Sequence, residues 1–181
     1  MTPNLKTKNI VIRKLQLSDL KGFADYRALP SVAKYQSWSD YTYDDAVALF
    51  ESTDYSKFGL ESNWFQLAIV DINSDKLIGD LAVHFIQDKQ VEIGFTIEPE
   101  FQRNGLGYEA LCAILDYIFL ELKKHRVIAV TDTHNISSCR LLEKTGFRKE
   151  AHYVENVFFK GSWGDEYLYA MLGSEYKKTN V

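Results

Sequence analysis

What the sequence lacks already excludes several classes of protein. Its two cysteines, Cys112 and Cys139, are too few for a disulfide framework, and their spacing matches no metal site. The net charge of -4 and the absence of a basic tract argue against nucleic acid as a partner, because that affinity depends on clustered lysine and arginine. No apolar segment is long enough to cross a membrane and none stands at the N-terminus. We therefore expect a soluble, unprocessed, cytoplasmic protein with no membrane partner and no metal.

What is present suffices for one well-packed unit. The 181 residues are 46% hydrophobic and 14% aromatic, and no repeat, linker or low-complexity segment divides them. A chain of this size can bury about 70% of the surface that it exposes when unfolded. We therefore predict a single domain over residues 1–181, and its mild acidity suits a cationic ligand.

The stretch from Val91 to Tyr108 predicts a strand, a glycine-bearing loop and a helix in direct succession. Apolar residues alternate with others over 91–97, and Pro99 ends the strand because proline cannot donate to a central ladder. A polar loop from Gln102 to Gly107 follows. After it, apolar residues recur at helical spacing: Leu111, Ile114, Leu115, Ile118 and Leu122. Because the first turn of a helix leaves backbone N–H groups without partners, this junction indicates an anion-binding site.

Three families of anion-binding loop could account for this junction. A P-loop requires a Lys-Ser or Lys-Thr pair after its glycines, and none follows here. The residues from Gly105 to Ala110 do match the dinucleotide fingerprint Gly-x-Gly-x-x-Ala. In that fold, however, the first glycine comes directly after the strand, whereas seven residues separate Ile97 from Gly105. That fingerprint also opens a run of βα units, and only about 75 residues remain after it.

The rest of the chain predicts further strands and helices around this centre. Short polar turns join the apolar strands before it, so those strands are antiparallel neighbours, and the helix after it makes a crossover to a parallel strand at 127–130. The predicted strands are 10–15, 64–70, 77–85, 127–130, 154–159 and 165–172. One predicted helix runs from a cap at Ser18 or Asp19 to Leu29, where Pro30 stops it. A second helix begins after a cap at Thr42 or Asp44, and a third runs from Asn135 to Gly146.

The third possibility for the loop rests on two motifs. Gln102-Arg103-Asn104-Gly105-Leu106-Gly107 resembles the Gln/Arg-x-x-Gly-x-Gly/Ala loop of the GNAT N-acetyltransferases, and it follows a Glu-Ile-Gly-Phe strand as it does there. The segment from Asn135 to Phe147 resembles the second signature of the ribosomal-protein (RimJ/RimL-type) branch, Asn-x-x-Ser and then Glu-Lys-x-Gly-Phe. Two motifs in the right order are more specific than either alone. The resemblance extends over nearly the whole chain. It implies an α/β GNAT fold with a mixed, mostly antiparallel seven-stranded twisted sheet, flanked by helices and splayed between its fourth and fifth strands.

In that family acetyl-CoA lies between the two splayed strands, which implies a site built from three segments of this chain. Phe95, Thr96 and Ile97 would supply backbone contacts to pantetheine, because a splayed strand leaves backbone groups unpaired. Asn135 and Ser138 belong to the second motif, whose asparagine touches the cofactor arm in that family. The loop would enclose the diphosphate with Gln102, Arg103, Asn104, Gly105, Leu106, Gly107 and Tyr108.

The reaction that the resemblance implies is direct attack of a neutral amine on the acetyl thioester in a ternary complex. A peptide amine (pKa about 7.7–8.0) or a lysine (about 10.4) must lose a proton, so a base is needed. Glu92 is the first candidate, unless it is a structural carboxylate, and His84 or water is the alternative base. Ser138 is the candidate general acid, unless it only hydrogen-bonds its own backbone. Leu142 replaces the tyrosine that many relatives carry near the end of this helix, and Cys139 lacks the paired histidine of a nucleophile.

The aromatic stretch from Ser31 to Tyr43 and the acceptor itself have more than one interpretation. Tyr35, Trp38, Tyr41 and Tyr43 either shape the entry of the acceptor, as this region does in GNAT folds, or pack a helix–helix connection. We predict a peptide or protein N-terminal amine as the acceptor. A small-molecule amine, such as a polyamine or an aminoglycoside, and a non-catalytic acyl-CoA-binding protein stay open. The oligomeric state also stays open between a monomer and a homodimer that pairs through the final hairpin.

Overall fold

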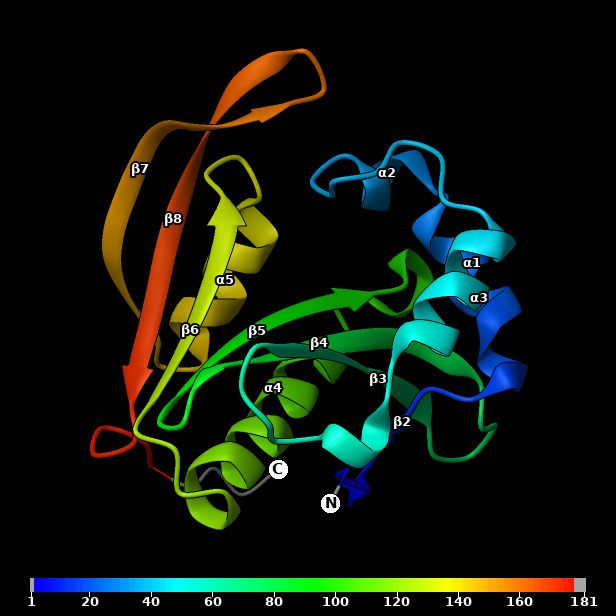
Figure 1. Cartoon of the computed structure of the whole chain (residues 1–181), viewed down its shortest axis with the longest axis horizontal. Coiled ribbons are helices and arrows are strands. Elements are labelled where there is room, and N and C mark those ends of the chain that lie inside the picture. Colours follow the sequence, from blue (N-terminus) through cyan, green and yellow to red (C-terminus); the bar gives the residue numbers. More distant parts are fainter. Residues whose placement is uncertain (1, 178–181) are drawn as a thin grey trace.

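The computed structural model describes residues 2–177 and is built on one open sheet of eight strands (Figure 1). The strand order is β1-β2-β3-β4-β5-β6-β8-β7, and each neighbouring pair is antiparallel except β5 and β6, which are parallel. The strands are β1 (Leu5–Lys6), β2 (Ile10–Lys14), β3 (Asn63–Asp71), β4 (Leu77–Gln87), β5 (Gln90–Ile97), β6 (Arg126–Asp132), β7 (Arg148–Phe159) and β8 (Ser162–Leu172). The predicted mixed, mostly antiparallel sheet is confirmed. The predicted count of seven strands is wrong, because β1 is too short for an alternating pattern to reveal it.

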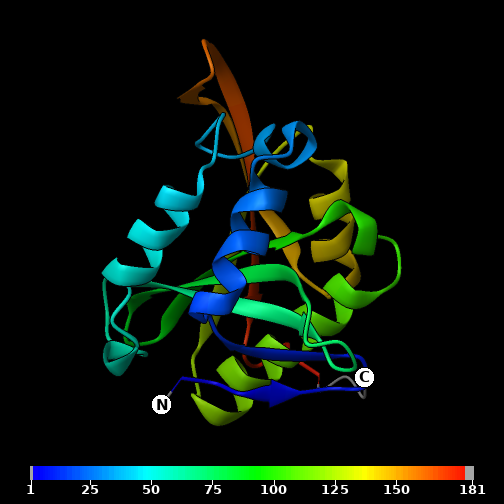
Figure 2. The same cartoon turned by 90° about the vertical axis from the view of Figure 1, so that its right-hand side faces the viewer.

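Helices cover both faces of the sheet (Figure 1 and Figure 2). The buried side chains of α1 and α3 pack on one face, and those of α4 and α5 pack on the other. The helices are α1 (Leu20–Arg27), α2 (Pro30–Ala33), α3 (Tyr43–Ser52), α4 (Leu106–Asp116) and α5 (Ile136–Lys144). Within residues 2–177, no helix combines the length and the apolar character needed to cross a membrane. Residues 1 and 178–181 of the predicted domain lie outside the described residues.

Several element boundaries differ from the prediction or sharpen it. Pro30 does not stop α1, which ends at Arg27; it begins α2 instead, because proline fits the first turn of a helix. Thr42 is the cap of α3, and its hydroxyl accepts a hydrogen bond from the Asp45 backbone N–H at 3.2 Å. The helix after the loop continues past α4 as a π-helical turn over Tyr117–Glu121. Strand β7 begins well before the predicted 154, because a register shift within β7 interrupts its alternation.

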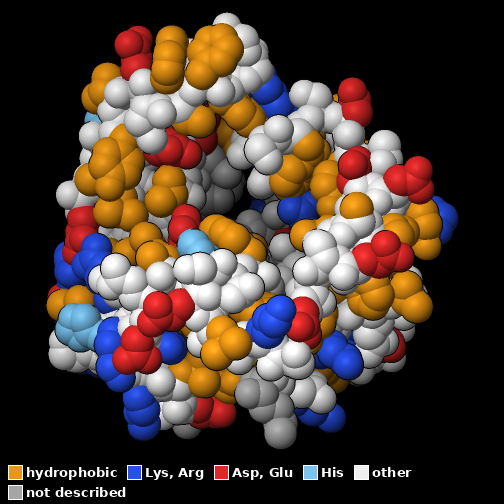
Figure 3. All heavy atoms as spheres, viewed as in Figure 1, with side chains coloured by type: hydrophobic (Ala, Val, Ile, Leu, Met, Phe, Trp, Pro, Cys, Tyr) orange, Lys and Arg blue, Asp and Glu red, His pale blue; other side chains and the backbone are white. Residues whose placement is uncertain are grey.

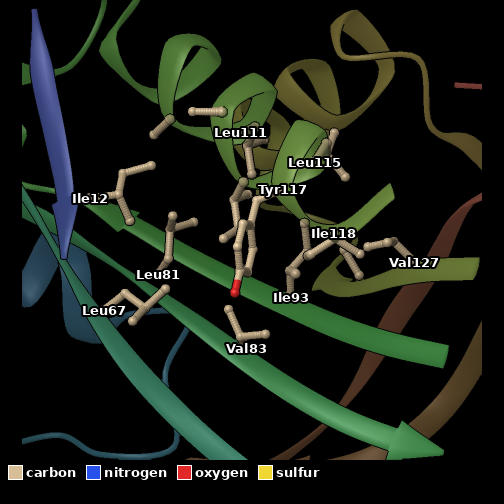
Figure 4. Packing of buried hydrophobic residues seen from close by; sticks show 14 of the residues in the cluster. Ile12, Leu67, Leu81, Val83, Ile93, Leu111, Leu115, Tyr117, Ile118 and Val127 are labelled. Atoms are coloured by element: carbon tan, nitrogen blue, oxygen red, sulfur yellow. The ribbon is translucent and has the colours of Figure 1, made fainter. Parts of the chain in front are cut away.

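The main hydrophobic core lies between α4 and the sheet (Figure 4). Four of the five residues in the predicted apolar stripe are fully buried, namely Leu111, Ile114, Leu115 and Ile118, while the fifth, Leu122, is half-buried at the cap of the π-helical turn. They pack against alternate residues of the central strands, among them Leu67, Leu81, Val83, Ile93 and Val127. On the other face of the sheet, Ala68, Val70 and Leu77 pack with α1 and α3 in a second, smaller core.

The sheet opens between β5 and β6. The two parallel strands pair at three positions, Gln90–Arg126, Val91–Val127 and Glu92–Ile128. Beyond Glu92, β5 continues beside β4 as far as Ile97, while β6 continues beside β8. The edges of β5 and β6 that face each other are thus unpaired over this length, which forms a wedge. The predicted splay is confirmed, and its two strands are β5 and β6.

A buried carboxylate ties the start of α4 to the N-terminal strands. Glu109 is 6% exposed and accepts three hydrogen bonds, from the Thr7 hydroxyl (2.6 Å), the Asn9 backbone N–H (2.8 Å) and Asn9 Nδ2 (2.7 Å). Burial alone would raise the pKa of Glu109, but these hydrogen bonds outweigh it and hold the pKa below its usual value. The ionised form is therefore the one that stabilises the fold.

We expect Glu109→Gln to lower the free energy of unfolding by about 1–3 kcal/mol at pH 7, because the amide nitrogen would face the Asn9 donor without an acceptor. A depressed folded pKa stabilises the protein above the unfolded pKa of about 4.3, and this stabilisation disappears as the pH falls through the folded pKa. Urea unfolding of both proteins at pH 7 and pH 3 checks this. If the free energies of unfolding of the wild type and Glu109→Gln differ as much at pH 3 as at pH 7, the stabilising role of the ionised Glu109 is contradicted.

Candidate active site

The wedge widens into a cleft of about 280 Å³ that reaches both faces of the sheet, because its lining includes Ile93 and Leu142 of the α4-side core as well as Asp80 beside α1. Figure 3 shows this hollow at the centre of the molecule, between the β6–β8 side and the α1–α2 side. Its floor comes from β4 and β5, and its walls come from β6, the start of α5, the β7–β8 hairpin and the segment after α2. The residues that line it are Arg27, Tyr35, Gln36, Ser37, Asp80, Ala82, Ile93, Gly94, Phe95, Thr96, Ala129, Val130, Thr131, Asp132, Asn135, Ser138, Leu142, Val157, Phe159 and Glu166.

The predicted anion-binding loop joins the end of β5 to the start of α4. Gly105 has φ of +81° as the residue before α4, and no heavy atom lies within 4 Å of the position that a Cβ would occupy there. The Glu109 N–H donates to the Gly105 carbonyl at 3.0 Å and so begins the intrahelical bonding. The N–H groups that precede it in this turn, from Leu106 and Gly107, come before the first intrahelical bond and are the kind of donor that an anion can use.

Two contacts hold this loop in place. The Gln102 side chain donates to the Ile97 carbonyl at 2.8 Å, so Gln102 anchors the loop to the end of β5. A Cβ at Gly107 would lie 3.1 Å from Leu141 Cδ2 and 3.4 Å from Ile97 Cγ1, which shows how closely α4 approaches α5 and β5 here. The loop is thus positioned beside the wedge rather than free to move away from it.

Asn135 and Ser138 meet at the first turn of α5, beside the wedge. Asn135 Oδ1 accepts a hydrogen bond from the Ser138 backbone N–H at 3.2 Å and so caps α5. This leaves the Asn135 amide NH₂ as the group that can donate to a ligand. Both residues line the cleft, and Ser138 is partly buried there. The structure therefore brings these two predicted residues together with Phe95 and Thr96.

Glu92 lies at the apex of the wedge, at the last position where β5 pairs with β6. It is opposite His84 on β4, and Glu92 Oε2 is 3.4 Å from His84 Nδ1. The His84 ring stacks on Trp64 at a centroid distance of 4.5 Å. Among the described residues of β5, the cleft lining begins at the next residue, Ile93. The predicted bases thus form one pair at the closed end of the cleft rather than two separate groups.

The cleft also contains charged residues that the sequence interpretation missed. Asp80 on β4 is 2% exposed and accepts hydrogen bonds from the Tyr26 hydroxyl and from Gln66 Nε2. Arg27 Nη1 lies 3.6 Å from Asp80 Oδ2. Burial raises the pKa of Asp80, while the Arg27 charge and the Tyr26 hydrogen bond oppose that rise. A charged residue inside the apolar 77–85 strand was the signal that could have revealed it.

Two more carboxylates occupy the opposite wall. Asp132 on β6 and Glu166 on β8 are direct partners in the β6–β8 ladder, and both line the cleft. Asp132 Oδ1 accepts from the His134 backbone N–H at 2.7 Å, and Glu166 Oε2 accepts from Asn156 Nδ2 at 2.7 Å. This wall therefore presents negative charge to whatever enters. Within residues 2–177, no cluster of three His, Cys, Asp or Glu side chains is arranged to hold a metal ion.

The aromatic stretch divides between the two roles considered for it. Trp38 and Tyr41 are partly buried, and both rings contact the Arg27 guanidinium. Tyr35 lines the cleft, and its hydroxyl donates to the His134 carbonyl across the opening at 3.1 Å. Tyr43 is exposed at the start of α3. Of the four aromatic residues, Tyr35 thus borders the cleft, whereas Trp38 and Tyr41 pack against Arg27.

Comparison with known proteins decides what this architecture is. Residues 9–148 match the family model described as an acetyltransferase (GNAT) domain. The chain belongs to the GNAT acetyltransferase family. This GNAT protein is 31% identical over 174 residues to YnaD, an uncharacterized N-acetyltransferase of Bacillus subtilis, a match that covers 96% of this chain and 99% of YnaD. A solved GNAT-family acetyltransferase from Bacillus anthracis has the same fold, with a TM-score of 0.86 at 28% identity, over 96% of this chain and 100% of that one.

Two further relatives carry a substrate in their names. A spermidine N(1)-acetyltransferase of Vibrio cholerae is 26% identical to this GNAT protein over 92% of this chain and 95% of its own length. A ribosomal protein uS5-alanine N-acetyltransferase of Escherichia coli is 34% identical over 79 residues, which are 44% of this chain and 41% of that one. The protein is thus an N-acetyltransferase that acts on an amine, and its relatives differ in which amine they take.

The GNAT family uses acetyl-CoA, and the residues of this chain fit it. A diphosphate needs backbone donors and room for close approach, which the α4 N-terminus and the open space at Gly105 supply. A pantetheine arm needs unpaired backbone, which the wedge edge of β5 beyond Glu92 supplies.

Proposed function

We propose that this protein transfers an acetyl group from acetyl-CoA to the N-terminal amine of a peptide or protein, as enzymes of the RimJ/RimL type do. The observation that carries this proposal is the wedge between β5 and β6, which has a helix N-terminus on one side and an open cleft on the other. A donor and an acceptor can thus enter from opposite faces of the sheet and meet in it. We further propose a single cytoplasmic domain over residues 1–181, a monomer or homodimer with no nucleic acid or membrane partner.

Three segments of the chain would hold acetyl-CoA. The loop and first turn from Gln102 to Tyr108 would receive the diphosphate, and the edge of β5 at Phe95, Thr96 and Ile97 would pair with pantetheine. Asn135 would donate its amide to the pantetheine arm. Bound there, acetyl-CoA supplies an activated acetyl thioester.

The residues around the wedge then act on the acceptor. The amine nitrogen bonds to the acetyl carbon, the carbon–sulfur bond breaks, one proton leaves the amine and one goes to the sulfur. Glu92, with His84 beside it, would take the proton from the amine directly or through water. Backbone N–H groups near Phe95 to Ile97 would donate to the acetyl oxygen as it gains charge, and the Ser138 hydroxyl would return a proton to sulfur.

A polyamine is the second candidate acceptor. The paired carboxylates Asp132 and Glu166 on the cleft wall favour a cationic substrate, and the Vibrio cholerae relative is named for spermidine. The peptide remains our proposal because a polyamine carries only positive charge and the cleft also contains Arg27.

Release of the CoA thiol in the presence of matched acceptors tests the proposal. We expect turnover with peptides that begin with serine, threonine or alanine, at a kcat/KM at least tenfold above that for spermidine or an aminoglycoside. An N-terminally acetylated copy of the best peptide is the control, because it lacks the reactive amine. Preference for spermidine would replace the peptide assignment with the second candidate. Tight CoA binding without turnover on any amine would instead indicate a non-catalytic acyl-CoA-binding protein.

A further inference from the structure

Arg27 is a buried arginine at the edge of the cleft whose hydrogen bonds are incomplete. It is 8% exposed, and its guanidinium carbon lies 4.3 Å from the ring centroids of both Phe23 and Trp38 and 5.1 Å from that of Tyr41. Its Nε and Nη1 atoms are buried and have no hydrogen-bond acceptor among the described residues. Aromatic faces hold the charge in place but do not accept its in-plane N–H groups. The arginine is thus fixed by the fold with donors left unmet.

The neighbouring Asp80 compensates the charge of Arg27 but not its hydrogen bonds. Asp80 Oδ2 lies 3.6 Å from Arg27 Nη1, which is an ion-pair distance and too long for a hydrogen bond. Both oxygens of Asp80 already accept, Oδ1 from Tyr26 and Oδ2 from Gln66. Since Arg27 lines the cleft, an oxygen atom of a bound acceptor is the partner that can complete its hydrogen bonds.

The surrounding charges decide what kind of oxygen that is. Asp80, Asp132 and Glu166 all line the cleft, and Arg27 is the only basic residue among the described residues that line it. Three carboxylates would repel an anionic ligand, whereas they would not repel an uncharged carbonyl oxygen in this way. The same carboxylates attract an ammonium group. The ligand that satisfies both requirements is an amine with a neutral carbonyl close to it, which is the first residue of a peptide.

We infer that Arg27 is a specificity-determining residue that donates a hydrogen bond to the carbonyl oxygen of the acceptor's first residue. This inference rests on the proposed N-terminal acetylation and assigns the group that recognises the peptide. Because Nε and Nη1 are buried, the guanidinium would have to turn within its plane, against the Phe23 and Trp38 rings, to present an N–H group to the cleft. A polyamine offers no oxygen, so binding it would leave Arg27 unsatisfied beside positive charge.

Two uncharged versions of the first peptide linkage test this role. The first ligand is a short peptide amide that begins with alanine, and the second is the same peptide with its first amide bond replaced by a trans carbon–carbon double bond, which removes the carbonyl oxygen without adding a charge. Calorimetry with CoA present measures both affinities without requiring turnover. We expect the wild type to bind the first peptide at least tenfold more tightly, the range expected for a hydrogen bond from a charged donor. Arg27→Lys keeps the charge next to Asp80 but lacks Nε and the planar fork, so the preference should fall below threefold with CoA affinity unchanged.

Tyr26→Phe is the control for a merely structural role. It removes a hydrogen bond to Asp80 from the same network but leaves Arg27 in place, so the tenfold preference should persist. If the wild type and Arg27→Lys show the same preference, the inference is overturned. It is also overturned if the wild type binds the two peptides equally or binds neither. Loss of the preference in Tyr26→Phe would also overturn it. If the preference follows Arg27 but no peptide is acetylated, the proposed activity fails while the recognition role stands.

Discussion

Replacing Glu92 by glutamine is expected to lower kcat by about 10²–10⁴-fold, the usual effect of removing a general base. An N-terminal amine with a pKa near 7.7–8.0 is largely protonated at neutral pH and cannot attack until it loses a proton. Glu92 lies where β5 and β6 part, and glutamine keeps its size and its place in the ladder. Steady-state kinetics with saturating acetyl-CoA and the best peptide measure the effect.

His84→Gln is the matched control for this substitution. Its side chain faces Glu92 across the β4–β5 ladder, so the two variants disturb the same pair from opposite sides. If Glu92 is the base, the histidine variant should lose much less activity than the glutamate variant. A loss below threefold in Glu92→Gln would instead assign the proton to His84 or to water, and a larger loss in His84→Gln would identify the histidine.

Gly107→Glu is expected to weaken CoA binding by about 100-fold or more. It places a carboxylate in the first turn of α4, where the diphosphate would lie, and juxtaposed like charges cost several kcal/mol. The Cβ would meet Leu141 Cδ2 at 3.1 Å, and that atom is the end of a side chain that can move. We therefore expect the variant to stay folded, with calorimetry measuring CoA affinity and circular dichroism measuring the fold.

Gly107→Ala separates the effect of the charge from that of the added carbon. Alanine introduces the same Cβ beside Leu141 and Ile97 without a carboxylate, so it should retain most of the CoA affinity. If alanine and glutamate weaken binding equally, close packing of α4 explains the loss and the loop need not contact the diphosphate. An unchanged affinity in Gly107→Glu would place the coenzyme elsewhere.

The parts of the fold that the sequence predicted well are those whose signal is local. The alternation in 91–97, the stripe from Leu111 to Ile118 and the glycine before α4 each depend on neighbours a few residues away. The same holds for the Asn135 cap, which bonds a residue in its own first turn. Such patterns are physical requirements of a strand, a helix or a turn, so they persist whatever surrounds them.

The parts that the sequence did not predict depend on contacts between distant segments. Arg27 gave no signal as a cleft residue, because its role appears only when α1, the aromatic segment and β4 come together around it. The division of Tyr35 from Trp38 and Tyr41 likewise follows from how the segment after α2 turns over the cleft. The pairing of Glu92 with His84 needed the β4–β5 register, which an irregularity between Phe85 and Gln87 shifts away from the one that the turn alone would set.

The short seam between β5 and β6 has a consequence for how the molecule holds together. Three ladder positions and the α4 crossover join the β1–β5 half of the sheet to the β6–β8 half. A coenzyme that pairs with the edge of β5 while touching α5 would act as an inserted strand that bridges the two halves. Because such a ligand binds only the folded chain, the free energy of unfolding should increase with coenzyme concentration by RT ln(1 + [L]/Kd). The reactant would thus also serve as a scaffold of the enzyme that consumes it.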